Sequence, residues 1–204
     1  MKKLLFIIPL ISIFIQGCYI GKPLKENKTI FIETSFETNV NNSFDNKYSD
    51  KGKADIYKKE FLKGLKNEGK LYNLDVYDDK LSKADYVLTI KYLSIKESSH
   101  AEVVNDEKSP HNGKSFLLSD IDVSSTFILY KGNKEKHLGE WSSSASKEEK
   151  ITNNRNLGDY MFGFNKDNSE YRFKGLKDDI CEDLSEKCGK HIIVKITRKI
   201  SKNL

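Results

Sequence analysis

Alternating polar and apolar residues predict a strand shortly after residue 28. Residues 29–38 (TIFIETSFET) place Ile30 and Ile32 on one face and Phe31 on the other, which is the period of a half-buried strand. The stretch that follows, 39–53, is rich in Asn, Ser and Asp. We interpret it as a surface loop that leads into a helix.

Residues 54–68 repeat their apolar side chains every three to four positions, which predicts an amphipathic helix. Its apolar stripe consists of Ala54, Tyr57, Phe61 and Leu65, and its polar side of Lys58, Lys59, Glu60, Lys63 and Lys66. We expect Ser49 or Asp50 to cap this helix and Gly69 to end it in a left-handed conformation. The short apolar stretch 71–77 would then return the chain to a sheet.

Three further stretches predict strands. Residues 84–95 (ADYVLTIKYLSI) are rich in the β-branched and aromatic side chains that favour extended structure. Residues 123–130 (VSSTFILY) and 137–146 (HLGEWSSSAS) alternate on either side of a polar connection at 131–136. Two such runs around a short connection predict a hairpin.

Apolar residues near the C-terminus recur every four positions, as in one long amphipathic helix. They are Ile180, Leu184, Cys188, Ile192, Ile196 and Ile200. The stretch 192–196 also alternates as a strand would, and periodicity leaves both structures open there. We expect helix up to at least Lys187. The order of elements predicts an α+β fold, an antiparallel or mixed sheet with two helices packed on one face.

The N-terminus has the composition of an export signal. Residues 1–3 carry two lysines, and residues 4–15 form an apolar run that is shorter than the ~20 residues needed to span a bilayer. Residues 15–18 (IQGC) then resemble the lipobox of bacterial lipoproteins. A signal peptide cleaved elsewhere and an uncleaved anchor helix are the alternatives. The resemblance implies removal of residues 1–17 and attachment of lipid to Cys18, with two or more acyl chains anchoring the protein stably.

The lipobox interpretation divides the chain into a signal peptide (1–17), a lipidated linker (18–28) and one α+β domain (29–204). Tyr19 stands where an aspartate would often retain a lipoprotein at the inner membrane. We therefore expect the outer membrane, with the domain in the periplasm or at the cell surface. Loss of the signal lowers the formal charge from +5 to +3, which is too weakly basic to predict a nucleic-acid partner.

Short motifs of the domain resemble a group of small envelope lipoproteins. The motifs are 61–65 (FLKGL) with Gly69, 84–89 (ADYVLT), and a hairpin from 127–130 (FILY) to 139–141 (GEW). The group comprises penicillin-binding-protein activators, curli-type secretion lipoproteins and the lipopolysaccharide-assembly lipoprotein. The resemblance implies a non-catalytic accessory or assembly factor that binds proteins or glycolipid and has no active-site residues to carry over.

Catalytic and metal-binding motifs are absent from the sequence. The four histidines, His100, His111, His137 and His191, have no metal-ligand spacing, and no HExxH, CxxC or nucleophile-elbow pattern occurs. We therefore expect no enzyme activity, no metal and no cofactor. A metal site in the polar stretch around the first two histidines is the alternative to a solvated loop.

Two cysteines remain in the domain, in what we expect to be an oxidising compartment. Cys181 and Cys188 would lie about 10.5 Å apart on a continuous helix, beyond the ~7 Å that a disulfide can bridge. We therefore expect both to be reduced, and the alternative, a bridge between them, requires that the segment between them is not helical.

The stretch 160–173 (YMFGFNKDNSEYRF) supplies the candidate partner-binding residues, because exposed aromatic side chains among polar ones are typical of docking surfaces. The candidates are Tyr160, Phe162, Phe164, Tyr171 and Phe173. Burial of these rings on the sheet is the alternative. A second polar stretch, the loop 98–115, is the other candidate for partner binding, and disorder is its alternative. We expect an envelope protein as partner, and the alternative function is a surface-exposed adhesin or ligand-binding lipoprotein.

Overall fold

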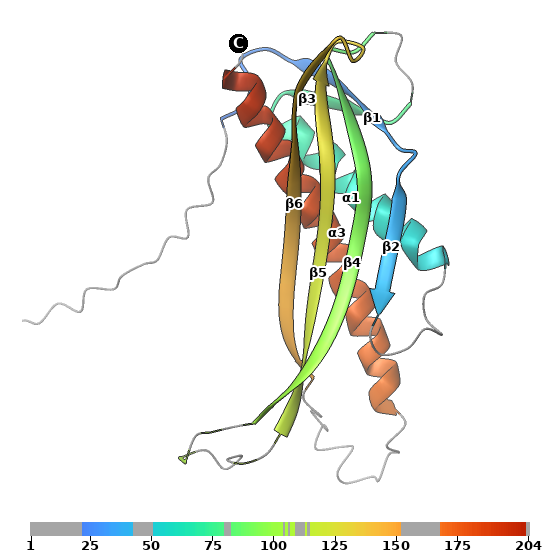
Figure 1. Cartoon of the computed structure of the whole chain (residues 1–204), viewed down its shortest axis with the longest axis vertical. Helices are drawn as coiled ribbons and strands as arrows, with labels where there is room; N and C mark the ends of the chain where they lie inside the picture. Colours follow the sequence, from blue (N-terminus) through green and yellow to red (C-terminus); the bar gives the residue numbers. More distant parts are fainter. Residues whose placement is uncertain are drawn as a thin grey trace, which may run out of the picture.

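The computed structural model describes residues 22–42, 51–79, 83–103, 105, 107–108, 113, 115–151 and 168–202. Within these residues it confirms the α+β fold, since two helices pack against a six-stranded mixed sheet (Figure 1). The elements are β1 (Lys28–Glu33), β2 (Glu37–Asn42), α1 (Lys51–Leu71), β3 (Leu74–Tyr77), β4 (Tyr86–Val103), β5 (Ser115–Lys131), β6 (Lys136–Ile151) and α3 (Asn168–Lys202). No helix in this part of the chain is long and apolar enough to cross a membrane.

The sheet has the strand order β3-β1-β4-β5-β6, and β2 pairs with β4 beyond the end of β1. β1 and β2 run parallel to their partners, whereas β4, β5 and β6 form an antiparallel meander. The prediction of one strand over 29–38 was wrong, because the chain breaks between the two short strands. Phe36 in this break turns inward and packs edge-on against Phe61, with 5.9 Å between ring centroids.

Strands β4 and β5 are longer than the strands predicted at 84–95 and 123–130. They pair from Tyr86 with Lys131 to Val103 with Ser115, so residues 98–103 and 115 of the stretch interpreted as a loop are strand. The surface loop expected at 39–53 was likewise wrong at both ends, where β2 and α1 lie. Backbone pairing does not need apolar side chains, and a polar strand therefore escapes a search for alternation. At ~3.3 Å per residue, β4 is about 60 Å long.

Both helices lie on the same face of the sheet, as predicted (Figure 1). α1 does not end at Gly69 but continues to Leu71, and Asn73 adopts the left-handed conformation with φ 56°. α3 is continuous from Asn168 to Lys202, so residues 192–196 are helical. The stripe of every fourth residue decides this, because Ile192 and Ile196 are fully buried.

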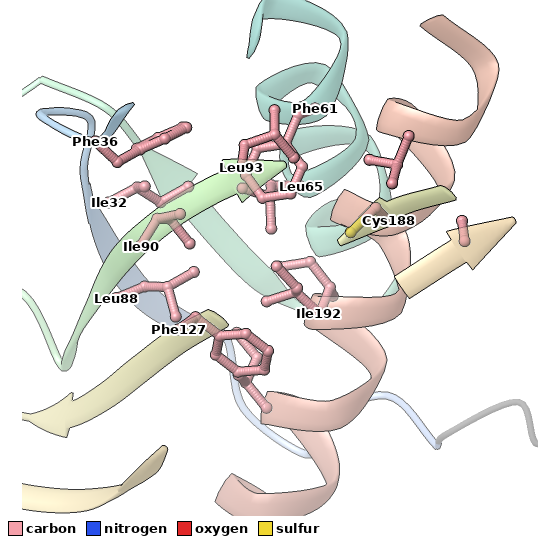
Figure 2. Close-up of a cluster of buried hydrophobic side chains, with 14 of the residues drawn as sticks. Ile32, Phe36, Phe61, Leu65, Leu88, Ile90, Leu93, Phe127, Cys188 and Ile192 are labelled. Carbon is pink, nitrogen blue, oxygen red and sulfur yellow. The ribbon is translucent and has the colours of Figure 1, made fainter. Parts of the chain in front are cut away.

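The core fills the space between this helical layer and the sheet (Figure 2). Phe61 and Leu65 project from α1 toward Leu93 on β4, and Ile192 of α3 lies above Phe127 of β5. The helices touch through glycines. A Cβ at Gly64 would lie 2.1 Å from the carbonyl oxygen of Glu186, and one at Gly189 would lie 2.3 Å from that of Phe61. The two helices therefore approach at backbone distance.

Ordered packing begins before β1. Leu24, which the sequence interpretation places in the linker, is 3% exposed, and its backbone N–H donates to the carbonyl of Tyr72 at 3.0 Å. Lys28 donates in the same way to Asn73 at 3.0 Å. These bonds fasten the N-terminal segment to the turn that follows α1.

Candidate functional site

A cleft of about 800 Å³ lies between α1 and β3. One wall is the outer side of α1, and the other is formed by residues 75–79 of β3 and the bend after it. Leu62 and Val76, both partly buried against the core, lie at its base, and Tyr77, which is 39% exposed, lines it as well. The cleft therefore combines an apolar base with charged walls.

Lysines form the wall on α1. Lys59, Lys63, Lys66 and Lys70 are spaced by four, three and four residues, which places them in one stripe along the helix. The stripe lies outside the buried positions of Phe61 and Leu65, which face the sheet. An amphipathic helix with its apolar side on the core necessarily presents this polar side outward.

The lysines of the cleft differ in how they are held. Lys66 pairs with Asp78 at 2.7 Å, and Lys63 pairs with Glu60 at 2.6 Å and with Glu186 of α3 at 3.4 Å. These partners hold two of the ammonium groups in place.

Lys58 also lines the cleft, but its ammonium group makes contacts within the domain. Its ammonium donates to the carbonyls of Thr34 at 2.6 Å and Phe36 at 3.3 Å, and lies 4.3 Å from the centre of the Phe36 ring. In contrast, Lys59 and Lys70 make no ion pair within the described part of the chain. These two are the ammonium groups that a ligand could neutralise.

Aspartates form the opposite wall. The hydrogen bond from Lys66 holds the pKa of Asp78 below its ordinary value, against the opposing effect of burial. Asp75 accepts a hydrogen bond from the side-chain amide of Asn27. Asp79, at the mouth, is exposed and has no described partner. One wall is thus basic and the other acidic.

This arrangement suits a polar chain that carries both signs of charge. A run of phosphates would be attracted by the lysines but repelled by the aspartates. No group of three or more His, Cys, Asp or Glu side chains among the described residues is arranged to hold a metal ion. The groups that line the cleft can bind by charge pairing and hydrogen bonding.

Most of the partner-binding residues predicted from the sequence lie outside the described residues. These are Tyr160, Phe162 and Phe164, and the predicted lipidation residue Cys18 also lies outside the described residues. The backbones of Tyr171 and Phe173 lie in the first turns of α3, which corrects the prediction of a loop there, and their side chains are also outside the described set.

The described histidines have structural contacts. The ring of His191 lies 3.0 Å from the carbonyl oxygen of Ser144 through Nδ1, and His137 packs against Tyr130 with 5.5 Å between ring centroids. His100 lies in β4, so it is not in a loop, and His111 is outside the described residues.

Cys181 and Cys188 are free thiols, as predicted, and both are buried. Burial raises the pKa of Cys188 to about 12, and its Sγ lies 3.6 Å from the carbonyl oxygen of Ser143. A thiol with such a pKa is almost wholly protonated at neutral pH and is a poor nucleophile.

Sequence reasoning missed the cleft although part of its signal was visible. The lysine stripe of α1 was interpreted only as the solvated side of a helix. Its spacing of four, three and four residues identifies a continuous basic face, but nothing local to the helix indicates that β3 would stand beside it. The second wall comes from the tertiary fold.

No family model matches this sequence, and no curated protein matches it significantly. Among solved structures, a homolog of neuraminyllactose-binding hemagglutinin from Helicobacter pylori is 14% identical, with a TM-score of 0.46 over 90% of this chain and 87% of that chain. A minor lipoprotein from Acinetobacter baumannii is 13% identical, with a TM-score of 0.32 over 86% of this chain and 92% of that one. Rare lipoprotein B from Shewanella oneidensis is 10% identical, with a TM-score of 0.35 over 82% and 97%. With every TM-score below 0.5, these similarities carry no conclusion about function.

Proposed function

We propose that this protein is a lipid-anchored, non-catalytic binding protein of the bacterial envelope, which holds a polar segment of a partner protein in the cleft between α1 and β3. The anchor is lipid on Cys18, and the outer membrane with a periplasmic domain is its proposed location. The observation that carries the binding role is the cleft itself, whose base is apolar and whose Lys59 and Lys70 have no described ion-pair partner.

The charges of the cleft favour a protein segment over other ligands. A basic wall facing an acidic wall can align an extended chain so that its carboxylates approach α1 and its ammonium groups approach residues 75–79. Electrostatic complementarity of this kind contributes mainly to specificity and association rate. The partly buried Leu62 and Val76 add apolar contact beneath the charged rims.

A photo-crosslinking amino acid at Asn67 tests this role in cells that produce the full-length protein. Asn67 is exposed and lines the cleft, and we expect a discrete adduct with one envelope protein. The matched control is the same amino acid at Ser144, which is exposed on β6 away from the cleft, and we expect no such adduct there.

The double variant Lys59→Glu/Lys70→Glu should remove the adduct at Asn67, whereas Lys96→Glu, which alters an exposed lysine of β4, should leave it unchanged. Unfolding by urea checks that the double variant is folded, with a free energy within about 0.5 kcal/mol of the parent. A folded double variant that retains the adduct would count against the cleft as the binding site.

Two alternatives make different predictions. If the predicted aromatic residues bind the partner, Phe162→Ala and Phe164→Ala will remove an adduct that the lysine variants leave intact. If the protein is a surface adhesin or ligand-binding lipoprotein, protease added to intact cells will cleave it. The periplasmic location predicts protection until the outer membrane is permeabilised.

A further inference from the structure

We propose that one end of the domain, here called the basic end, lies against the membrane that holds the anchor and binds its anionic lipid headgroups. The basic end consists of residues 22–28, the C-terminal turn of α1 with Tyr72 and Asn73, the turn between β5 and β6, and the C-terminal turn of α3. This inference rests on the proposed lipid on Cys18. It adds a lipid surface as a second binding partner, and Lys70 belongs both to the basic end and to the cleft.

Hydrogen bonds join the parts of the basic end. Leu24 donates to Tyr72 at 3.0 Å, and Gly132 in the turn between β5 and β6 donates to Asp85 at 2.8 Å. Asp85 in turn accepts from Thr29 at the start of β1. Figure 1 shows the C-terminal end of α3 at this same end of the molecule, opposite the far end of the β4–β5 hairpin.

Chain length brings the basic end to the membrane. Leu24 is six positions after Cys18, and an extended chain covers at most about 3.3 to 3.6 Å per residue. The lipid-bearing residue must therefore lie within roughly 20 Å of the point where Leu24 is fastened to Tyr72. The far end of β4 is about 60 Å away along the strand, and this distance exceeds the full length of the extended linker.

The charge of the basic end matches an anionic surface. Six lysines are exposed there and form no ion pair within the described chain: Lys22, Lys25, Lys70, Lys131, Lys136 and Lys202. Several carboxylates of this end are already engaged, Glu26 by Lys28 at 2.8 Å and Glu33 by Lys134 at 2.7 Å. Glu135, Asp75 and Asp85 offset part of the remaining charge.

Helix electrostatics account for only part of this cluster. Lys70 and Lys202 lie in the last turns of α1 and α3, where cations favour the negative end of the helix dipole. The other four lysines lie in the N-terminal segment and in or beside the hairpin turn, where no helix end needs them. Beside Lys70, Leu71 is 66% exposed, and an apolar side chain among lysines is suited to the boundary between headgroups and acyl chains.

The test uses the mature lipidated protein in vesicles, with a fluorescent label placed by Asn133→Cys in the β5–β6 turn or by Val103→Cys at the far end of β4. Both positions are exposed, and the two native thiols of the domain are buried. A quencher attached to lipid headgroups measures proximity. In vesicles with a third of phosphatidylglycerol we expect strong quenching at position 133 and little at position 103.

Charge variants separate headgroup binding from mere tethering. Lys131→Glu/Lys136→Glu should lower the ratio of membrane-apposed to detached domains at least about tenfold, because each lysine near an anionic surface contributes about fivefold. The charge-matched control Lys96→Glu/Lys187→Glu, which alters two exposed lysines outside both the cleft and the basic end, should leave the ratio unchanged. Pure phosphatidylcholine vesicles or 0.5 M salt should weaken quenching at position 133 in the parent.

The outcomes distinguish this inference from the proposed anchor. Mass spectrometry of the N-terminal peptide reports lipidation independently, and an unlipidated Cys18 overturns both proposals. A lipidated protein whose position 133 is no more quenched than position 103 overturns the membrane-facing orientation alone and leaves the basic end to an acidic protein. If quenching at position 133 is unchanged by salt and by charge reversal, the lysines do not bind the headgroups and their proposed role is overturned.

Discussion

The carboxylate of Asp85 accepts two hydrogen bonds from Thr29, one from its backbone N–H at 2.8 Å and one from its hydroxyl at 2.9 Å. The backbone N–H of Asp85 donates to the same hydroxyl at 3.0 Å. These contacts join the start of β1 to the residue that precedes β4. They also give a physical reason for the aspartate in the alanine-aspartate-tyrosine motif, because its carboxylate accepts these hydrogen bonds. Its neighbours Ala84 and Tyr86 are buried.

We expect Asp85→Ala to lower the free energy of unfolding by about 1 to 2 kcal/mol, because charge-assisted hydrogen bonds to an ordered backbone are lost. Urea denaturation measures the change. The matched control is Asp79→Ala, which removes an exposed aspartate that has no described partner and should change the free energy by less than about 0.5 kcal/mol.

The contribution of Asp85 should depend on pH in a defined direction. The hydrogen bond from the backbone of Thr29 lowers the pKa of Asp85 below its ordinary 3.8, with burial opposing. Stabilisation is therefore complete above pH 3.8 and is lost as the pH falls through the lower pKa of the folded state. The difference between the parent and Asp85→Ala should shrink over that range, and a difference that stays constant to pH 2 would contradict the assignment.

The glycine contacts between α1 and α3 should tolerate no side chain. Gly64→Ala and Gly189→Ala each place a Cβ within 2.3 Å of a carbonyl oxygen of the other helix, so the helices must separate. We expect each change to cost about 2 to 3 kcal/mol in free energy of unfolding. Gly52→Ala, in the first turn of α1 with open space around it, is the control and should be neutral or stabilise by up to about 1 kcal/mol. Thermal or urea unfolding of the three variants decides the matter.

Cys188 should resist thiol reagents as long as the protein is folded. Its pKa of about 12 and its burial leave almost no accessible thiolate at pH 8. In the lipidated protein we expect labelling by a disulfide reagent only at the rate of unfolding, and rapid labelling in 6 M guanidinium. Ser142→Cys, at an exposed position of β6, provides the reactive control. Rapid modification of Cys188 in the folded protein would show that α3 opens locally.

One buried hydroxyl should make the protein less stable than it could be. Thr197 Oγ1 is buried without a hydrogen-bond partner among the described residues. Thr197→Val keeps the shape of the side chain and removes this unsatisfied group, so we expect a gain of about 1 kcal/mol in free energy of unfolding. Ser185→Ala is the comparison, because that buried hydroxyl donates to the carbonyl of Cys181 at 2.7 Å and its removal should not stabilise. A loss of stability in Thr197→Val would mean that the hydroxyl has an acceptor.

The pattern of apolar residues predicted the elements whose buried side chains recur at a regular spacing. The stripe that includes Phe61 and Leu65 indicated α1, and the repeat through Ile196 indicated α3, because a buried helical face needs apolar residues at that spacing. The hairpin around 131–136 was also predicted and is confirmed.

The pattern of apolar residues did not predict the segments that are held mainly by main-chain hydrogen bonds. The outer halves of β4 and β5 pair through main-chain hydrogen bonds, and residues such as Ser98 and Asp120 show no apolar alternation. The alternation placed Phe36 on the same face as Ile30 and Ile32, and all three are buried, but it did not reveal the break between β1 and β2. The cleft also depended on tertiary packing, since its lysines and aspartates come from different elements.

The place of α3 in the core has a consequence for delivery of the chain. β1 pairs with β3 and β4, both of which follow it in the sequence, and the layer over β5 and β6 is closed by Ile192, Ile196 and Ile200 near the C-terminus. A polypeptide that emerges N-terminus first, from a ribosome or a translocation channel, thus presents β1 early and α3 late. Until α3 has emerged, the apolar side chains that it covers on β5 and β6 stay exposed. Completion of the core therefore waits for residues 192–200, and a chain stalled near residue 190 would remain a substrate for chaperones and proteases.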